Sequence, residues 1–111
     1  MSSFNDHLGL QVGEDGQSVV LDTRPEHQII PGTIHFAVLT TLAEVSAARA
    51  AEASVVPASL HIQLMRRAEP GRLIGRGRVL KRGRRLVAAE GEVFQDDRLV
   101  AKASVQFAVV G

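Results

Sequence analysis

The sequence contains no cysteine, and its only aromatic residues are four phenylalanines. Without cysteine the chain can form neither disulfides nor thiolate metal sites, which is typical of a protein of the reducing cytoplasm. Four phenylalanines offer little surface on which nucleic-acid bases could stack. The four histidines are scattered along the chain, so we expect no metal site, and nothing in the sequence indicates a cofactor.

Long hydrophobic runs are also missing. No apolar stretch approaches the roughly 20 residues that span a membrane. The first ten residues lack a basic region followed by an apolar run, so no signal peptide is expected. The chain has 111 residues, of which 45% are hydrophobic. This length and composition predict a single domain, residues 1–111, with its own hydrophobic core.

Acidic and basic side chains are unevenly divided, although the net charge is only +1. Residues 1–56 contain two basic and seven acidic side chains, whereas residues 57–111 contain eleven and five. This asymmetry predicts an anionic partner for the second half of the chain. The densest basic segment is KRGRR, residues 81–85. It is either an ordinary charged hairpin turn or a phosphate site, because arginine guanidinium groups suit phosphate oxygens.

The first half of the chain is predicted to form a hairpin, a loop and one long helix. Glu14–Gly16 indicate the hairpin turn, and the prolines and glycine of residues 25–35 indicate the loop. The helix is expected to begin near Ile34, with Thr33 as its N-cap, and to end near Ala53. Periodicity places the larger apolar side chains of this helix on one face, toward a sheet.

The second half of the chain is predicted to be an antiparallel meander, with apolar and polar residues alternating along each strand. A turn centred near Gly83 would place Arg76 opposite Glu92. It would also place Arg78 opposite Glu90, and these opposite charges would pair on a solvated face. Because the arginines are paired, nucleic-acid binding through the basic half is disfavoured. One helix cannot cover both faces of such a sheet, so its flanks are left for a partner.

Glu44 is the one charged side chain between Phe36 and Ala48. The simplest interpretation is a glutamate on a solvated helix face, because glutamates are seldom buried. The alternative is a functional carboxylate, since its neighbours are small and would let a second chain or a ligand approach. A helix N-terminus offers free N–H donors, but nine residues of helix place Glu44 about 13 Å away. Two antiparallel subunits could bring the two groups together.

The segment from His35 to Glu44 resembles the hotdog-fold acyl-CoA thioesterases, in the branch related to phenylacetate degradation. That family has a His followed nine residues later by an Asp or Glu, and the resemblance extends over roughly residues 10 to 110. It implies an α+β hotdog fold, in which one long helix is wrapped by a curved antiparallel sheet of five to six strands. It also implies a homodimer or homotetramer with active sites at the dimer interface.

The resemblance further implies a cytoplasmic thioester hydrolase that acts on acyl-CoA. Glu44 would be the general base or nucleophile, and His35 would orient the site. The N–H groups of Phe36 and Ala37 would hold the thioester oxygen. Three arginines of the basic turn would bind the phosphates of CoA: Arg82, Arg84 and Arg85.

Two positions depart from the family pattern. Phe36-Ala37 replace a common Gly-Gly, so a phenyl ring crowds the acyl entrance. Ile29 occupies a substrate-binding position where the family often has Asn or Gln to orient the carbonyl or the water. These departures favour the alternative function, a hotdog module that binds acyl-CoA or a related ligand without catalysis. The acyl-carrier dehydratase branch is excluded, because its glutamate position is Ala37 here.

Overall fold

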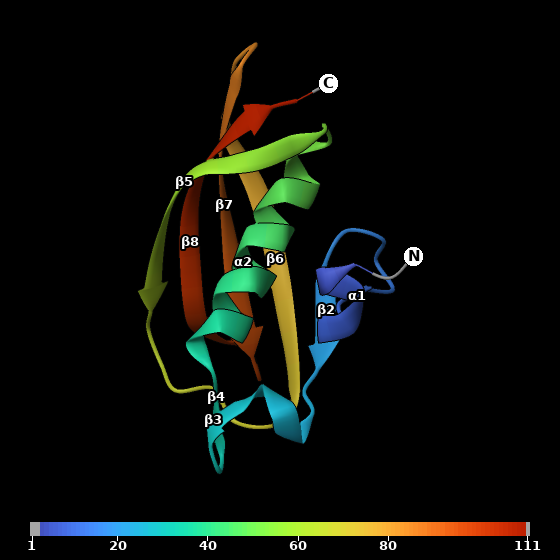
Figure 1. Cartoon of the computed structure of the whole chain (residues 1–111), viewed down its shortest axis with the longest axis vertical. Helices are drawn as coiled ribbons and strands as arrows, with labels where there is room; N and C mark the ends of the chain where they lie inside the picture. Colours follow the sequence, from blue (N-terminus) through green and yellow to red (C-terminus); the bar gives the residue numbers. More distant parts are fainter. Residues whose placement is uncertain (1–2, 111) are drawn as a thin grey trace.

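The computed structural model describes residues 3–110, which form one long helix packed against a six-stranded antiparallel sheet (Figure 1). The helices are α1 (Phe4–Leu8), the 3-10 turn η1 (Pro25–His27) and the long helix α2 (Phe36–Ala51). The sheet contains β1 (Gln11–Val12), β2 (Val19–Asp22), β5 (Val55–Leu64), β6 (Arg72–Arg82), β7 (Leu86–Gln95) and β8 (Arg98–Val109). A separate ribbon contains β3 (Gln28–Ile30) and β4 (Thr33–Ile34).

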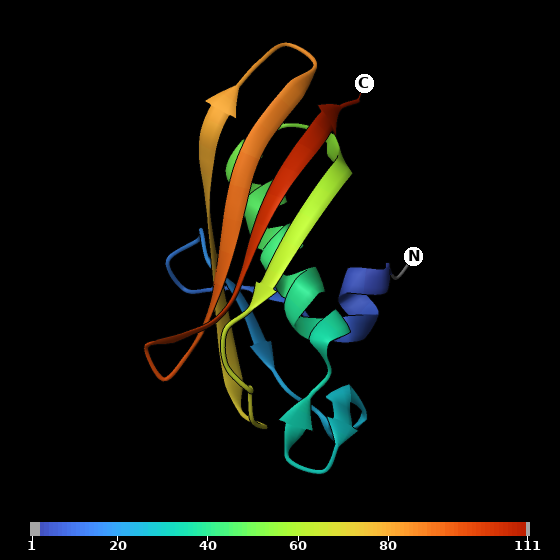
Figure 2. The same cartoon turned by 90° about the vertical axis from the view of Figure 1, so that its left-hand side faces the viewer.

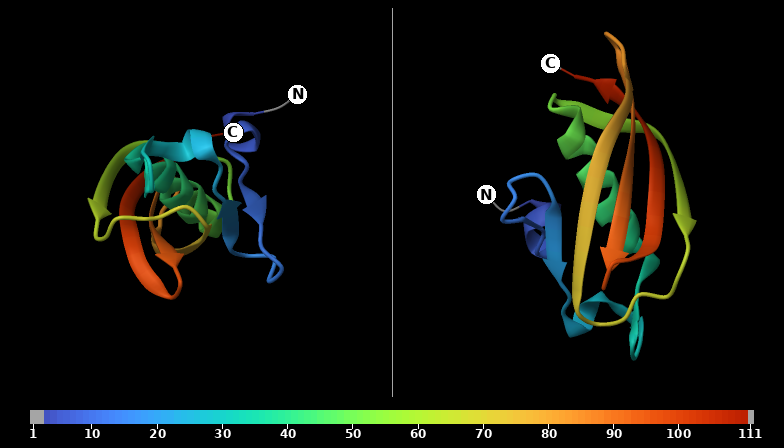
Figure 3. Two further views of the ribbon diagram at one scale, coloured as in Figure 1. Left: turned by 90° about the horizontal axis from the view of Figure 1, so that it is seen from below. Right: turned by 180° about the vertical axis from the view of Figure 1, so that it is seen from behind.

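The sheet curves around α2, as the end-on view in Figure 3 shows. Leu42, Ala43 and Ala47 of the helix are fully buried against it. Glycine in the sheet lets the helix come this close, because a Cβ built on Gly91 would lie 1.9 Å from the carbonyl oxygen of Ala43. Phe107 of β8 is fully buried in the same core. The predicted arrangement, a long helix wrapped by a curved antiparallel sheet of the hotdog type, is confirmed.

The predicted meander is confirmed for β6, β7 and β8, which pair in chain order, but β5 does not continue it. The order of the whole sheet shows the difference. It is β1-β2-β6-β7-β8-β5, so β5 follows α2 but pairs with β8 at the far edge of the sheet. Figure 2 shows β6, β7, β8 and β5 side by side with α2 on one face. Pro57 fits this edge position, next to a register shift, because proline lacks a donor for a second neighbour. Most of β5 is exposed.

The predicted register of β6 and β7 is confirmed, with Arg76 opposite Glu92 and Arg78 opposite Glu90. The pairing of charges is only partly as predicted. Arg78 forms an ion pair with Glu90, but Arg76 bonds to Asp15 in the β1–β2 turn at 3.2 Å. Glu90 is also buried rather than solvated. Burial tends to raise its pKa, yet Arg78 and its second neighbour, a lysine, outweigh that effect and lower the pKa.

No helix of residues 3–110 has the length and hydropathy that crossing a membrane would require. Over the same residues, no three His, Asp or Glu side chains are placed together so that they could hold a metal ion.

Candidate active site

The chain enters α2 through the β3–β4 ribbon, which fixes the position of the helix start. The N–H of His35 donates to the carbonyl oxygen of His27 at 2.9 Å. The N–H of Ile34 donates to the carbonyl oxygen of Ala68, also at 2.9 Å. Gly32 forms the ribbon turn with a φ of 85°, a left-handed conformation that favours glycine. The segment predicted to be a loop is therefore a hydrogen-bonded support for the helix N-terminus.

The helix is capped by His35, and the prediction of Thr33 as N-cap is wrong. Nδ1 of His35 accepts a hydrogen bond from the N–H of Ala37 at 2.9 Å. The imidazole also stacks on the Phe36 ring, with 4.7 Å between centroids. Thr33 cannot cap because it is paired in β4, where its hydroxyl is buried without a hydrogen-bond partner. Capping and stacking together fix the orientation of the His35 ring.

The two N–H groups predicted to hold a thioester oxygen are in different states. The N–H of Phe36 makes no hydrogen bond within residues 3–110, as expected in the first turn of a helix. The N–H of Ala37 is engaged by His35 and becomes available only if that bond breaks. Phe36 is therefore the donor that this structure offers to a ligand. The Phe36 side chain is 53% exposed beside it.

Glu44 lies in the middle of α2 and is half-buried. Burial raises the pKa of its carboxyl group above the ordinary value of a glutamate. Hydroxyl groups one turn earlier do not bond to it, because Thr40 and Thr41 each donate to the helix backbone at 2.8 Å. Within residues 3–110, the carboxyl group of Glu44 makes no hydrogen bond or ion pair. A desolvated carboxylate without partners can accept a proton from a bound ligand or water.

The structure does not bring Glu44 and the helix start together within one chain. Both groups belong to the same straight helix, and nine residues correspond to about 13 Å along its axis. A single reacting carbonyl must lie about 3 Å from each group that acts on it. One chain therefore supplies a carboxylate in one place and a free N–H in another.

Ile29, predicted to be a substrate-binding residue, lies on β3 of the ribbon beside the helix start. Its side chain is 54% exposed, and that of Ile30 is 59% exposed. An aliphatic side chain in this position can contact a ligand but cannot donate or accept a hydrogen bond.

The three arginines of the basic turn are in different environments. Nη1 of Arg82 donates to the carbonyl oxygen of Ala51 at 2.6 Å, so this arginine binds the C-terminal end of α2. Arg84 and Arg85 are exposed at the β6–β7 turn. The turn lies at the opposite end of α2 from His35, and a helix of 16 residues is about 24 Å long. Within one chain, the predicted phosphate cluster is remote from the helix start.

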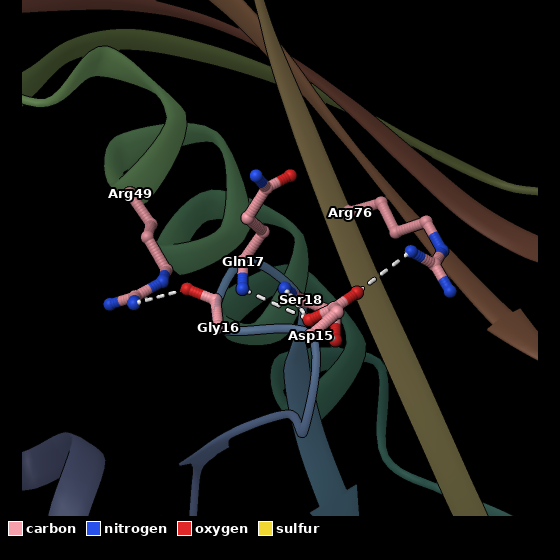
Figure 4. A network of polar contacts seen from close by, with 6 residues as sticks. All are labelled: Asp15, Gly16, Gln17, Ser18, Arg49 and Arg76. Carbon is pink, nitrogen blue, oxygen red and sulfur yellow. Dashed lines mark hydrogen bonds and ion pairs between the residues drawn. The ribbon is translucent and has the colours of Figure 1, made fainter.

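A polar network that was not predicted from the sequence joins the β1–β2 turn to α2 and β6 (Figure 4). Nη2 of Arg49 donates to the carbonyl oxygen of Gly16 at 2.8 Å. Asp15 accepts from the N–H of Ser18 at 2.8 Å and pairs with Arg76. These bonds hold the pKa of Asp15 well below its usual range, the Ser18 bond first. Turn chemistry around Asp15 is visible in the sequence, but partners this distant are not.

Comparison with known proteins gives one family match, to a model described as the acyl-CoA thioesterase N-terminal domain, over residues 25–108. A candidate esterase from Mycobacterium tuberculosis is 30% identical, with a TM-score of 0.86, over 96% of this chain and 95% of its own. A variant of a phenylacetic acid degradation protein from Thermus thermophilus is 26% identical, with a TM-score of 0.87, over 96% and 98%. A Bacillus halodurans protein solved with CoA shares the fold, with 21% identity and a TM-score of 0.82 over 95% and 75%. No curated protein matches the sequence.

Proposed function

We propose that this chain, which belongs to the acyl-CoA thioesterase family whose N-terminal domain model it matches, hydrolyses an acyl-CoA thioester at a site shared by two protomers. The observation that carries the proposal is Glu44. It is half-buried and unpaired within residues 3–110, and its pKa is raised by burial. A solvated surface glutamate would be neither half-buried nor raised in pKa by burial. Such a carboxylate suits a general base, whose pKa should approach the working pH.

In the proposed reaction, the N–H of Phe36 donates to the thioester carbonyl oxygen and stabilises the negative charge that develops there. Glu44 removes a proton from water, and the water oxygen attacks the carbonyl carbon. The C–S bond then breaks, CoA leaves as a thiolate, and the proton passes to the sulfur. Alternatively, Glu44 attacks the carbonyl carbon itself and water hydrolyses the resulting anhydride. His35 acts in both cases by holding the helix start in place.

The proposed site requires a homodimer, because Glu44 lies eight residues after Phe36, about 12 Å from the Phe36 N–H along one helix. An antiparallel second helix would place Glu44 of one protomer beside Phe36 of the other. Two features support such an assembly. The small residues around Glu44 allow close approach, and β5 presents an exposed sheet edge, which is a template for pairing with another chain. A dimer of dimers is the natural larger assembly.

The basic turn is proposed to bind the phosphates of CoA. Arg84 and Arg85 are exposed, whereas Arg82 is partly engaged by the helix end. The basic turn and the helix start of one chain are too far apart to act on the same part of a ligand. The turn of one protomer would therefore contribute to a site that the partner completes. The CoA present in the Bacillus halodurans protein supports CoA as the ligand class. Guanidinium groups pair with phosphate oxygens through two parallel hydrogen bonds.

The direct test is a hydrolysis panel of acetyl-, octanoyl-, dodecanoyl- and phenylacetyl-CoA, with release of free CoA thiol as the readout. We expect turnover of at least one thioester above the rate without protein. If none is hydrolysed while calorimetry shows acyl-CoA binding, the second candidate function holds, a binding module without catalysis. Ile29 favours that alternative, because it offers no hydrogen bond where the resemblance places Asn or Gln. If the assays detect neither turnover nor binding, both functions are refuted.

A further inference from the structure

An apolar groove runs along the flank of α2 that faces the N-terminal segment. Its volume is about 550 Å³. The side chains that give it its apolar character come from the N-terminal segment, α2, β5 and the C-terminal end: Leu10, Val12, Val45, Ala48, Val55 and Val110. We refer to it as the N-terminal groove. Val12 and Val110 are 52% and 42% exposed, so the groove is open at its rim to a ligand.

The N-terminal groove begins next to Glu44. Val45 is the next residue along α2, and Ala48 lies one helical turn beyond Glu44 on nearly the same side of the helix. Both side chains line the groove. A ligand whose reacting carbonyl lies at Glu44 can therefore continue along the helix into the groove without crossing the core.

A second hollow of about 570 Å³ borders the same half of α2 but has a different character. It is lined by Arg49, Arg78 and Arg82 together with Ser46 and Glu52. Arg49 borders both hollows. Its guanidinium group bonds to the carbonyl oxygen of Gly16 and is thereby held toward the β1–β2 turn (Figure 4).

Of the two hollows, only the N-terminal groove suits an apolar chain. Placing an acyl chain among guanidinium groups would desolvate charges without replacing their hydrogen bonds. The hydrophobic effect instead favours the N-terminal groove, where valine, leucine and alanine outnumber the polar lining residues Asn5, Gln11, Arg49 and Ser54. The N-terminal groove is therefore the hollow that suits an acyl chain, and Arg49 marks its boundary with the charged hollow.

We propose that the N-terminal groove binds the acyl group of the substrate, and that the preferred substrates are thioesters of linear acyl chains longer than acetyl. The proposal rests on the thioesterase function proposed above. Each methylene group that enters the groove should raise kcat/KM by up to about fourfold, which corresponds to the transfer free energy of one buried methylene. The increase should end when the groove is full.

The test measures kcat/KM for acetyl-, butyryl-, octanoyl- and dodecanoyl-CoA in three variants. Ala48→Leu fills the groove floor, and Val12→Gln makes its rim polar. Leu80→Gln is the matched control, because Leu80 is an equally exposed aliphatic residue (54%) that does not line the groove. We expect the octanoyl-to-acetyl ratio to fall about tenfold or more in both groove variants, the loss of about two buried methylenes. The control should keep the wild-type ratio.

Two outcomes would overturn the proposal, and a third would leave Val12→Gln as the deciding variant. If the protein hydrolyses acyl-CoA but the ratio is unchanged in both groove variants, the acyl chain binds elsewhere. If Ala48→Leu does not fold, as judged by circular dichroism, the Val12→Gln variant tests the proposal alone, because Val12 is exposed and its replacement should leave the fold intact. If the groove variants change the oligomeric state in light scattering, the groove is a protein interface.

A binding measurement separates this proposal from the proposed function. Fluorescence titration with cis-parinaric acid, a fatty acid, does not depend on hydrolysis. If no thioester is hydrolysed but the wild type binds this acid and both groove variants bind it about tenfold more weakly, the groove assignment stands and the catalytic function fails. If the wild type neither binds the acid nor prefers longer acyl chains, the groove assignment fails.

Discussion

Replacing Glu44 with glutamine removes the only acidic side chain of α2 while keeping its size and shape. Because the carboxyl group of Glu44 makes no hydrogen bond or ion pair within residues 3–110, glutamine breaks no polar contact there. The fold and the assembly should therefore be unchanged, as judged by circular dichroism and light scattering. Any loss of hydrolysis can then be assigned to the missing carboxylate.

The expected loss follows from the role of a general base. Proton transfer by a positioned side chain contributes about 10²- to 10⁴-fold to the rate, or about 2.7 to 5.4 kcal/mol of the barrier. Glu44→Gln should lower kcat by that factor and leave KM nearly unchanged, because glutamine fills the same space. In the wild type, kcat should rise with pH as Glu44 loses its proton. The midpoint should lie above the ordinary pKa of a glutamate, because burial raises the pKa.

The same raised pKa predicts an effect on stability. Between the ordinary and the raised pKa, the unfolded chain has released the proton that the folded chain still holds. The wild type therefore loses stability as pH rises through this window, and the loss remains at higher pH. Glutamine does not ionise, so the Glu44→Gln variant does not lose this stability. It should unfold at a higher temperature than the wild type at neutral pH, and at the same temperature below the ordinary glutamate pKa.

Rates should be measured on whichever thioester the wild type hydrolyses best, with thermal unfolding at matched protein concentration because assembly shifts the melting temperature. An unchanged kcat in Glu44→Gln would end the catalytic assignment of this residue. A lower kcat without any gain in stability at neutral pH would show that the carboxylate is solvated. If acid quenching and mass spectrometry detect an acyl group on Glu44, the residue is the nucleophile rather than the base.

Four further outcomes are expected. Ile29→Asn should raise kcat if a missing hydrogen bond limits turnover, and no gain in a folded variant would mean that another group does this work. Arg84→Ala with Arg85→Ala should raise KM for acyl-CoA and weaken its salt dependence, but spare a short thioester without the nucleotide; equal loss on both substrates would make the turn structural. Light scattering should give a dimer or tetramer, and an 11.9 kDa monomer at micromolar concentration would contradict the shared site. Gly91→Ala should cost at least about 1 to 3 kcal/mol of unfolding free energy in urea denaturation, because its Cβ meets the carbonyl oxygen of Ala43 at 1.9 Å.

The elements themselves could be predicted from the sequence, because their signals are local. Small and apolar residues between Phe36 and Ala48 indicated the helix, and alternation of apolar and polar residues indicated the strands. The turn at Gly83 was enough to predict the register of β6 and β7, which the structure confirms at Arg76 and Arg78. In a hairpin, the turn determines which residues lie opposite each other.

Partners distant in the sequence could not be predicted in this way. Arg76 pairs with Asp15 rather than with the glutamate opposite it. β5 crosses to the far side of the sheet, although a meander would have placed it beside β6. The Arg76–Asp15 pair and the position of β5 both depend on how the sheet curves around α2, and no local sequence pattern contains that information.

The candidate site divides in the same way. The sequence by itself identified Glu44 and the spacing that separates it from His35, because one carboxylate among small apolar residues is a local anomaly. Only the tertiary structure decided that Glu44 is half-buried, that His35 takes the Ala37 N–H while that of Phe36 stays free, and that the basic turn lies at the other end of α2. Burial and hydrogen-bond partners are set by chain segments that meet only after folding. A carboxylate's pKa and a donor's availability are therefore properties of the packed structure, not of the local sequence.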